Sequence, residues 1–175
     1  MKIQRSAVVL LLGMLLVTTL ACGGESITWA IYSNSSLGIS IQYPQDWTKS
    51  EGESGGVSFF TPKTDASDLG IVVVSVYEQE QPVTLSEWVD ELIRVLSAGQ
   101  TGFELSESSA TTISDMLAQK VVYTYRSGQY SVKCIEVVSV KDNNIVYTIE
   151  FLADVTTYNR DVKTVQQMID SFVIY

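Results

Sequence analysis

Carboxylates are the side chains with the widest chemical scope in this 175-residue sequence, which contains 20 Asp and Glu residues and no His. The absence of His excludes Ser-His-Asp and Cys-His nucleophile systems and every zinc or iron site that needs a His ligand. Two carboxylates alone can hydrolyse a glycosidic bond, but the sequence reveals no such pair beside an apolar, aromatic-rich cleft. No Ser lies in a Ser-x-x-Lys context, and the one Gly-x-Ser-x-Gly run, at 52–56, precedes an expected strand rather than a helix and has no His to activate its Ser. We therefore predict that the chain is not an enzyme, and a carboxylate-based hydrolase is the least favoured function.

Four carboxylates in the loops around an expected strand at 57–60 are the candidates for a metal site: Glu51, Glu53, Asp65 and Asp68. Ca²⁺ accepts loop carboxylates, but this spacing is not that of the 12-residue EF-hand loop. Solvated acidic loops have the same composition. The segment 142–144, Asp-Asn-Asn, offers further oxygens, although tight turns favour these residue types. We therefore predict no cofactor, and calcium is the ion that the four carboxylates would hold if they held one.

The N-terminal residues have the pattern of an export signal. Lys2 and Arg5 precede an uncharged stretch over 7–20, a basic segment followed by a short apolar one. The stretch is shorter than the ~20 residues that span a bilayer. It runs into Ala21, Cys22 and two Gly residues, which resembles the lipobox of bacterial lipoproteins, although Thr stands at position 19, where Leu is usual. The resemblance implies cleavage before Cys22 and lipid attachment to it. The alternatives are ordinary cleavage, or an uncleaved anchor in which Cys22 has no role.

This pattern divides the chain into a signal peptide at 1–21, a lipidated N-terminus and short tether at 22–31, and a single domain at 32–175. The product would be exported and anchored by lipid to the cell membrane or the outer membrane, with its domain on the extracytoplasmic side. Trp29 in the tether suits either a lipid–water interface or packing on the domain. Cys134 would remain as the second Cys, either a small buried hydrophobe or a reactive thiol.

Charge limits the partners of the exported domain. Loss of residues 1–21 would remove two of the eleven basic residues and none of the twenty acidic ones, which changes the net charge from −9 to −11. Such a domain is a poor ligand for nucleic acid, and basic residues cannot hold it on an anionic membrane. We expect membrane contact through the acyl chains and a protein partner.

Strands dominate the expected domain. Alternation of apolar and polar residues predicts a strand at 37–43, which ends at Pro44. Apolar or alternating runs predict five more strands, at 57–60, 71–77, 116–126, 130–141 and 145–153. Turn residues at 127–129 and 142–144 join the last three into a meander.

Two helices are expected to cover this sheet. Thr84 and Glu87 form a capping box, an apolar stripe follows, and Gly99 ends the first helix. A second apolar stripe runs from Tyr158 to Phe172 and predicts a helix that continues to the chain's end. Helices that lay their stripes on an antiparallel sheet of about six or seven strands give an α+β sandwich.

The meander also predicts a charge ladder. Three-residue turns at 127–129 and 142–144 would place Lys120 opposite Glu136, and Glu136 opposite Glu150. Two carboxylates directly across a ladder repel each other, and Lys120 would relieve part of that repulsion. The alternative is a solvated surface row that contributes ~0–1 kcal/mol.

Two short segments resemble the PsbP-like domains. In the first, at 32–47, Gly38 leads into a strand and Tyr43, Pro44 and Trp47 form the Tyr-Pro-x-x-Trp turn after it. The second, at 168–172, ends in the pair Ser171 and Phe172. The order of strands, helix, meander and helix also agrees, so the resemblance covers nearly all of 32–175 and implies a PsbP-like α/β sandwich. Trp47 is expected to pack in the core, and stacking on a ligand is the alternative.

The resemblance also implies a role. The founding member of the family is the extrinsic protein of plant photosystem II, which helps to retain calcium and chloride, and similar bacterial proteins are often lipoproteins with no assigned reaction. Because this sequence has no His, the His-based metal sites of the plant branch do not carry over. We predict a non-catalytic, membrane-anchored binding or assembly accessory for an envelope or membrane protein complex. The alternative is a module that retains an ion, such as calcium, or binds a small ligand.

Overall fold

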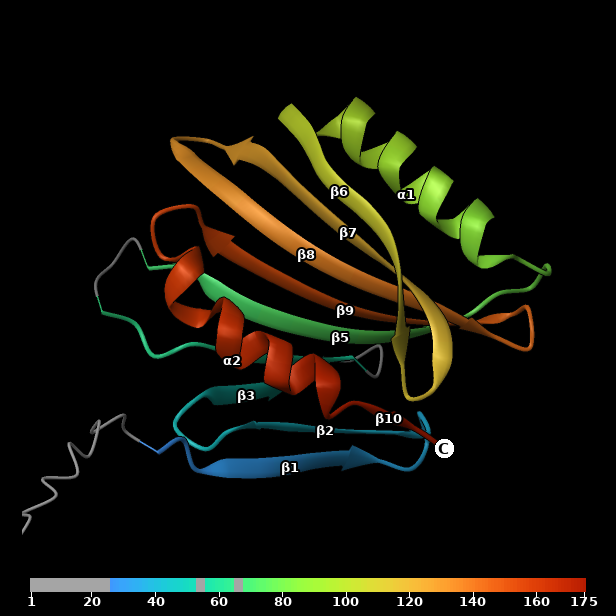
Figure 1. The fold of residues 1–175 in the computed structure, drawn as a ribbon, viewed down its shortest axis with the longest axis horizontal. Helices are drawn as coiled ribbons and strands as arrows, with labels where there is room; N and C mark the ends of the chain where they lie inside the picture. Colours follow the sequence, from blue (N-terminus) through green and yellow to red (C-terminus); the bar gives the residue numbers. More distant parts are fainter. Residues whose placement is uncertain (1–25, 53–55, 65–67) are drawn as a thin grey trace, which may run out of the picture.

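The computed structural model describes residues 26–52, 56–64 and 68–175. Its largest element is a seven-stranded antiparallel sheet, in which the strands follow the order β3-β4-β5-β9-β8-β7-β6 (Figure 1). Its strands are β3 (Thr48–Glu51), β4 (Val57–Phe60), β5 (Gly70–Glu78), β6 (Thr101–Ile113), β7 (Met116–Ser127), β8 (Tyr130–Lys141) and β9 (Ile145–Asp154). Successive strands along the chain are neighbours in this order except at β5, which pairs with β9.

A second sheet of three strands lies beside the first. It has the order β1-β2-β10, with β1 (Trp29–Asn34), β2 (Ile39–Pro44) and β10 (Val173–Ile174). β1 begins inside the segment 22–31 that the sequence assigns to the tether, and Trp29 packs against the main core. The first described residues are therefore part of the folded domain.

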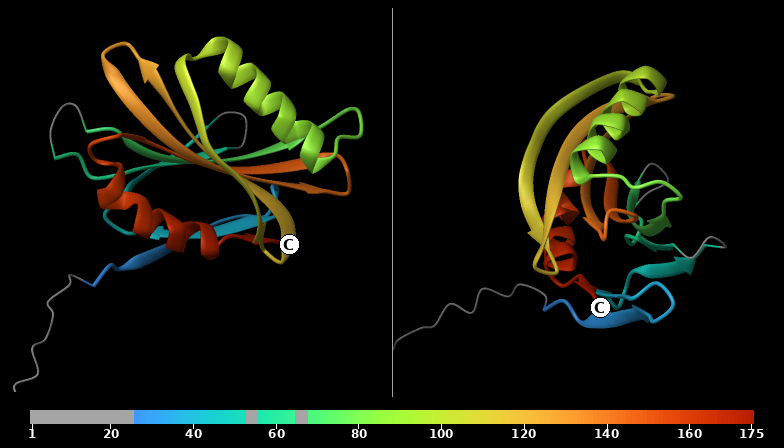
Figure 2. Two further views of the ribbon diagram at one scale, coloured as in Figure 1. Left: turned by 45° about the horizontal axis from the view of Figure 1, so that its top comes forward. Right: turned by 90° about the vertical axis from the view of Figure 1, so that its right-hand side faces the viewer.

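The two helices cover opposite faces of the large sheet, which is strongly curved (Figure 2). α2 (Tyr158–Asp170) and the small sheet enclose the main core, where Phe59, Phe151 and Met168 are fully buried. α1 (Leu85–Gly99) packs on the other face, over β6, β7 and β8. The α+β class predicted from the sequence is confirmed.

The start of α1 follows the predicted capping box. The amide of Glu87 donates to Oγ1 of Thr84 over 3.2 Å, and the amide of Thr84 donates to the Glu87 carboxylate over 2.9 Å. Two amides that the helix leaves without an internal partner are thereby satisfied. The apolar stripe that begins at Leu85 includes Val89 and Leu92. It packs in a second hydrophobic core, which lies between α1 and the large sheet.

The second helix is shorter than the sequence indicates. The stripe predicts a helix to the chain's end, but α2 ends at Asp170 and β10 follows, so this prediction is wrong for the last residues. The hydroxyl of Ser171 donates to the carbonyl of Met168 over 2.7 Å and accepts from the amide of Gln42 over 2.9 Å. The chain leaves the helix there because β2 offers backbone partners that a further helical turn cannot reach.

Turn length decides the register of the meander. β8 and β9 pair as predicted, with Glu136 directly opposite Glu150. The turn between β7 and β8 contains two residues rather than three, because Ser127 pairs with Tyr130. Lys120 therefore lies opposite Val137, and its predicted position opposite Glu136 is wrong. A shift of one residue moves every side chain to the other face of a sheet, so Lys120 instead forms an ion pair with Glu107 of β6 at 2.9 Å.

Candidate functional site

A cleft with a volume of about 620 Å³ opens where the first described residues, the turn after β2 and the start of α2 meet. Its walls are apolar at Ile27, Pro44, Trp47 and Pro62, and polar or charged elsewhere. The polar and charged lining residues are Ser26, Thr28, Gln45, Asp46, Thr64, Arg160, Asp161 and Thr164. Its volume lies within the range of ligand-binding clefts, about 300–1,000 Å³, but its lining is more polar than that of most small-molecule sites.

The turn after β2 builds the apolar wall. Pro44 ends the strand, and its carbonyl accepts the amide of Trp47 over 3.0 Å. The amide of Gln45 donates to the carbonyl of Thr28 over 2.8 Å, which fastens the incoming chain to this turn. Trp47 lines the cleft, but it is only 7% exposed and belongs to the main core, so it mainly supports the fold.

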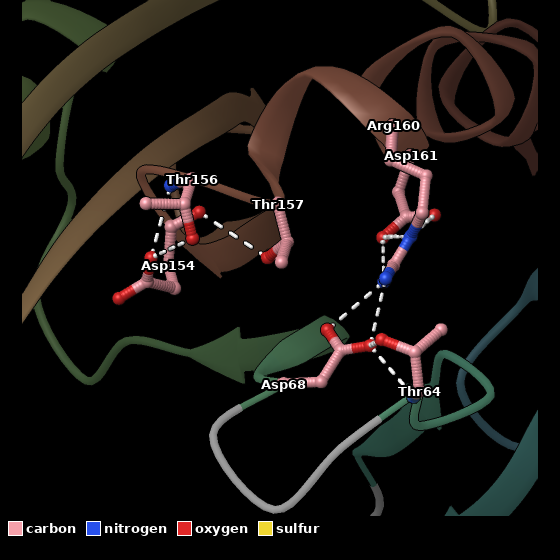
Figure 3. A network of polar contacts seen from close by, with 7 residues as sticks. All are labelled: Thr64, Asp68, Asp154, Thr156, Thr157, Arg160 and Asp161. Carbon is pink, nitrogen blue, oxygen red and sulfur yellow. Dashed lines mark hydrogen bonds and ion pairs between the residues drawn. The ribbon is translucent and has the colours of Figure 1, made fainter.

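An arginine-centred network forms the opposite wall (Figure 3). The guanidinium of Arg160 donates to both carboxylate oxygens of Asp68, over 2.7 and 3.0 Å, and to the carboxylate of Asp161 over 2.6 Å. Both the amide and the hydroxyl of Thr64 donate to Asp68 over 2.9 Å. The network thus joins the first turn of α2 to the loop before β5.

This network also sets the protonation of its members. The hydrogen bond from Arg160 is the main reason why the pKa of Asp68 lies well below the ordinary 3.8, and the bonds from Thr64 act in the same direction. Hydrogen bonds to Asp161 and Asp68 raise the pKa of Arg160 above its ordinary value. An ionised carboxylate held by arginine is a poor proton donor and a poor nucleophile. The geometry therefore favours binding over acid–base or nucleophilic chemistry.

The cleft is negative in spite of its arginine. Each of the three guanidinium nitrogens of Arg160 donates to a carboxylate of Asp68 or Asp161. Asp46 adds a further carboxylate at the rim, and no ion pair joins it to another described residue. A cationic group of a ligand fits this charge better than an anionic one.

A second group of ionisable residues lies under α1, outside the cleft. Glu136 is 7% exposed and faces Glu150 across the ladder, and the hydroxyl of Tyr123 donates to Glu150 over 2.9 Å. Burial, and then the charge of Glu150, raise the pKa of Glu136 to about 8. Burial also raises the pKa of Glu150 and of the Cys134 thiol. The solvated surface row considered for this ladder is therefore wrong at Glu136, which is buried.

The four candidate metal ligands do not form a described site. Glu53 and Asp65 lie outside the described residues. Glu51 is exposed on β3 and bound to Lys49, and Asp68 is bound to Arg160. Among residues 26–52, 56–64 and 68–175, no three His, Cys, Asp or Glu side chains are placed to hold a metal ion.

The two segments that resemble PsbP-like domains contact each other where β2 meets the C-terminal residues. Gly38 has a φ of +65°, and a Cβ there would lie 2.9 Å from the carbonyl oxygen of Tyr175. The amide of Tyr175 donates to the carbonyl oxygen of Gly38 over 3.0 Å, while Phe172 is buried in the main core. The ring centroids of Tyr43 and Phe59 are 4.7 Å apart. These residues hold β2 to the C-terminal segment, and of them Pro44 and Trp47 alone line the cleft.

The sequence does not predict the arginine network. Arg160 and Asp68 are 92 residues apart in the chain, so no local pattern connects them. The one available signal is an arginine followed by an aspartate in the first turn of an expected helix, which is common on solvated helices.

The sequence of this chain matches a known protein family. The α+β sandwich matches the family model described as PsbP-like protein over residues 23–174. The chain therefore belongs to the PsbP-like protein family, as the sequence resemblance indicates. No curated protein sequence matches it. A membrane-crossing helix is absent from the part of the chain that the structure describes, since neither α1 nor α2 has the required length and apolar composition.

Solved structures from several organisms share the fold. Cyanobacterial PsbP (CyanoP) of Synechocystis sp. PCC 6803 is similar with a TM-score of 0.62 and 18% identity, over 89% of this chain and 98% of that one. Protein PA94 of Pseudomonas aeruginosa, of unknown function, gives 0.63 and 12%, over 84% and 97%. LpqN of Mycobacterium tuberculosis, involved in cell envelope biogenesis, gives 0.59 and 16%, over 87% of each chain. At these identities the likeness shows the fold alone.

Proposed function

We propose that the chain is a lipid-anchored, non-catalytic binding module of the cell envelope, which holds a protein partner at the membrane through the cleft beside its N-terminal segment. Membership of the PsbP-like family supports a binding role, and the envelope role of LpqN, which has the same fold, is compatible with this location. The chemistry of the cleft also supports a binding role, because Arg160 forms ion pairs with Asp68 and Asp161, and carboxylates held in this way are poor proton donors and nucleophiles. The membrane is the cell membrane or the outer membrane.

One observation carries this proposal: residues 26–28 form part of the cleft wall. Ser26 follows Cys22 by four residues, and four residues of fully extended chain reach at most about 14 Å. A lipid on Cys22 would therefore keep the cleft within that distance of the lipid attachment point. A partner in the cleft must then lie at, or protrude from, the same membrane.

Lipidation is the first prediction. Intact mass after extraction from membranes should correspond to loss of residues 1–21 and addition of acyl chains, because Cys22 becomes the N-terminal residue of a lipoprotein. Cys22→Ala should leave an unprocessed precursor or release the protein from the membrane. Cys134→Ala is the matched control, and it should leave the acyl mass unchanged. An unacylated wild-type product would overturn the anchor.

The charge of the cleft gives the second prediction. Asp46→Asn should weaken capture of the partner from a detergent extract, because it removes a rim carboxylate without changing the shape of the cleft. Asp90→Asn, on the exposed side of α1, is the matched control and should leave capture unchanged. Capture should also fall as salt shortens the range of electrostatic attraction from about 10 Å at 0.1 M to about 3 Å at 1 M.

Equal capture by wild type, Asp46→Asn and Asp90→Asn would contradict a role for the cleft. Thermal stabilisation of the purified chain by added calcium, with no partner captured, would instead favour the ion-retaining alternative.

A further inference from the structure

The outer edge of β6 is the longest open sheet edge in the described part of the chain. β6 spans Thr101–Ile113, thirteen residues, and pairs with β7 on one side; no described strand pairs with its other side. It lies at the outside of the curved sheet in the right-hand view (Figure 2). The β3 edge at the opposite end of the sheet has four residues. Backbone amides and carbonyls along an open edge can pair with another extended chain.

The edges of β-sheets in proteins are normally protected against pairing with another chain. The two halves of β6 differ in this protection. The register is irregular between Thr101 and Glu104 and between Leu105 and Glu107, and such bulges prevent an added strand from pairing. From Glu107 to Ile113 the register with β7 is unbroken. This second half contains no Pro and no Lys, the residues that usually protect an edge.

The second half is also held in place and accessible. Gln119 of β7 donates to Oγ of Ser108 over 3.0 Å, and Lys120 is paired with Glu107. The tip of the hairpin is fixed because the amide of Ile174 donates to Oγ of Ser114 over 2.8 Å. The side chains along this half are small and mostly polar, and Ser108, Ala110 and Thr112 are exposed. A preformed, uncovered strand pays little ordering cost when another strand joins it.

We propose that the edge of β6 from Glu107 to Ile113 receives an extended, Lys- or Arg-bearing segment of a partner protein as an additional strand. Main-chain hydrogen bonds would supply affinity in this mode, and side chains would supply specificity. The charge around the edge indicates which kind of segment would bind. Three carboxylates, those of Glu104, Glu107 and Asp115, lie on or next to the edge, and Lys120 is the nearby cation, paired with Glu107. The whole chain carries a net charge of −9. A second copy of the chain would bring the same negative charge to the edge, so a basic segment is favoured.

The test uses peptides as probes on the full-length chain purified in detergent. One peptide has seven residues that alternate Lys and Val, and the other alternates Glu and Val. At a concentration ten times its dissociation constant, the Lys peptide should slow hydrogen exchange of the outward-facing amides between Glu107 and Ile113 by about tenfold. The effect should weaken at 1 M salt, and the Glu peptide should have none.

Two proline variants provide the matched control. Adjacent residues of a strand direct their N–H groups to opposite sides, so one of Ser109→Pro and Ala110→Pro removes an outward amide and the other an amide bonded to β7. The outward variant should fold normally, since edge strands tolerate Pro there, and should lose peptide protection. The inward variant should lower the melting temperature.

Four results would overturn the proposal, and the wild-type titration decides even if neither variant folds. They are no slowed amide in this half of β6, equal protection by the two peptides, unchanged protection in the folded outward variant, and concentration-dependent protection without peptide. The last would assign the edge to a second copy of the chain. Because the Asp46→Asn experiment tests the cleft separately, failure at the edge leaves the proposed function standing.

Discussion

The free energy of unfolding should fall as pH rises from about 4.5 to about 8, because of the buried carboxyl of Glu136. The ordinary pKa of Glu is 4.5, and in the folded chain that of Glu136 is about 8. Between these values the unfolded chain has released a proton that the folded chain still binds. Stability from this group should be complete below 4.5 and should fall by about 1.4 kcal/mol per pH unit above it, to reach a plateau above 8.

Glu136→Gln isolates this effect, because it has almost the same shape and does not titrate. Urea unfolding at pH 5 should give similar stabilities for wild type and variant, whereas at pH 8 the variant should be more stable by several kcal/mol. Glu150 lies directly opposite, with its carboxylate bonded to Tyr123, and its pKa is raised in the same direction, so Glu150→Gln should remove part of the remaining slope. Parallel stability profiles for wild type and Glu136→Gln would show that Glu136 does not hold its proton in the folded chain.

Asp68→Ala should destabilise the fold by about 2–3 kcal/mol. The change removes a fully buried carboxylate from Arg160 and leaves the amide of Thr64 without its partner. Breaking a buried ion pair costs about 3–5 kcal/mol, whereas exposed pairs contribute about 0–1 kcal/mol. The expected cost lies between these ranges because the Arg160 side chain is 36% exposed.

Chemical unfolding at neutral pH measures this cost, and Glu91→Ala is the matched control. Glu91 pairs with Arg94 on the exposed side of α1, so its loss should change stability by less than about 1 kcal/mol. Because the pKa of Asp68 is lowered, its contribution is present above its ordinary pKa of 3.8 and should be lost as pH falls below that value. An equal cost for the two variants would mean that Arg160 finds other partners when Asp68 is absent.

Sequence patterns predicted the elements whose signals are local. The capping box at Thr84 and Glu87 located the start of α1, and apolar runs located β4 and β8 with their observed bounds. They did not predict β6, because most of this edge strand is exposed and it has no apolar alternation to detect. The two-residue turn after Ser127 contains the same residue types as a three-residue turn, which is why the position of Lys120 was wrong by one residue.

The candidate site was less predictable than the fold, because it depends on contacts between distant segments. Of the cleft residues, the sequence singled out Pro44 and Trp47 for their structural roles. Asp68 was identified as a carboxylate that could bind calcium, whereas the fold places it against Arg160 of α2. The pair Glu136 and Glu150 was predicted to be opposite each other, but its burial depends on how α1 packs on the sheet, which no local pattern specifies.

Site-specific photo-crosslinking in intact cells tests the central claim most directly. A photoreactive residue would replace Thr164, which lines the cleft, or Gln167, which is exposed on the same helix and does not line it. We predict one discrete protein adduct from position 164 in the membrane fraction, none from 167, and loss of the adduct in a Cys22→Ala background. Equal adducts from both positions, or no adduct from 164 in a correctly folded and anchored protein, would contradict a membrane-anchored module that binds its partner through this cleft.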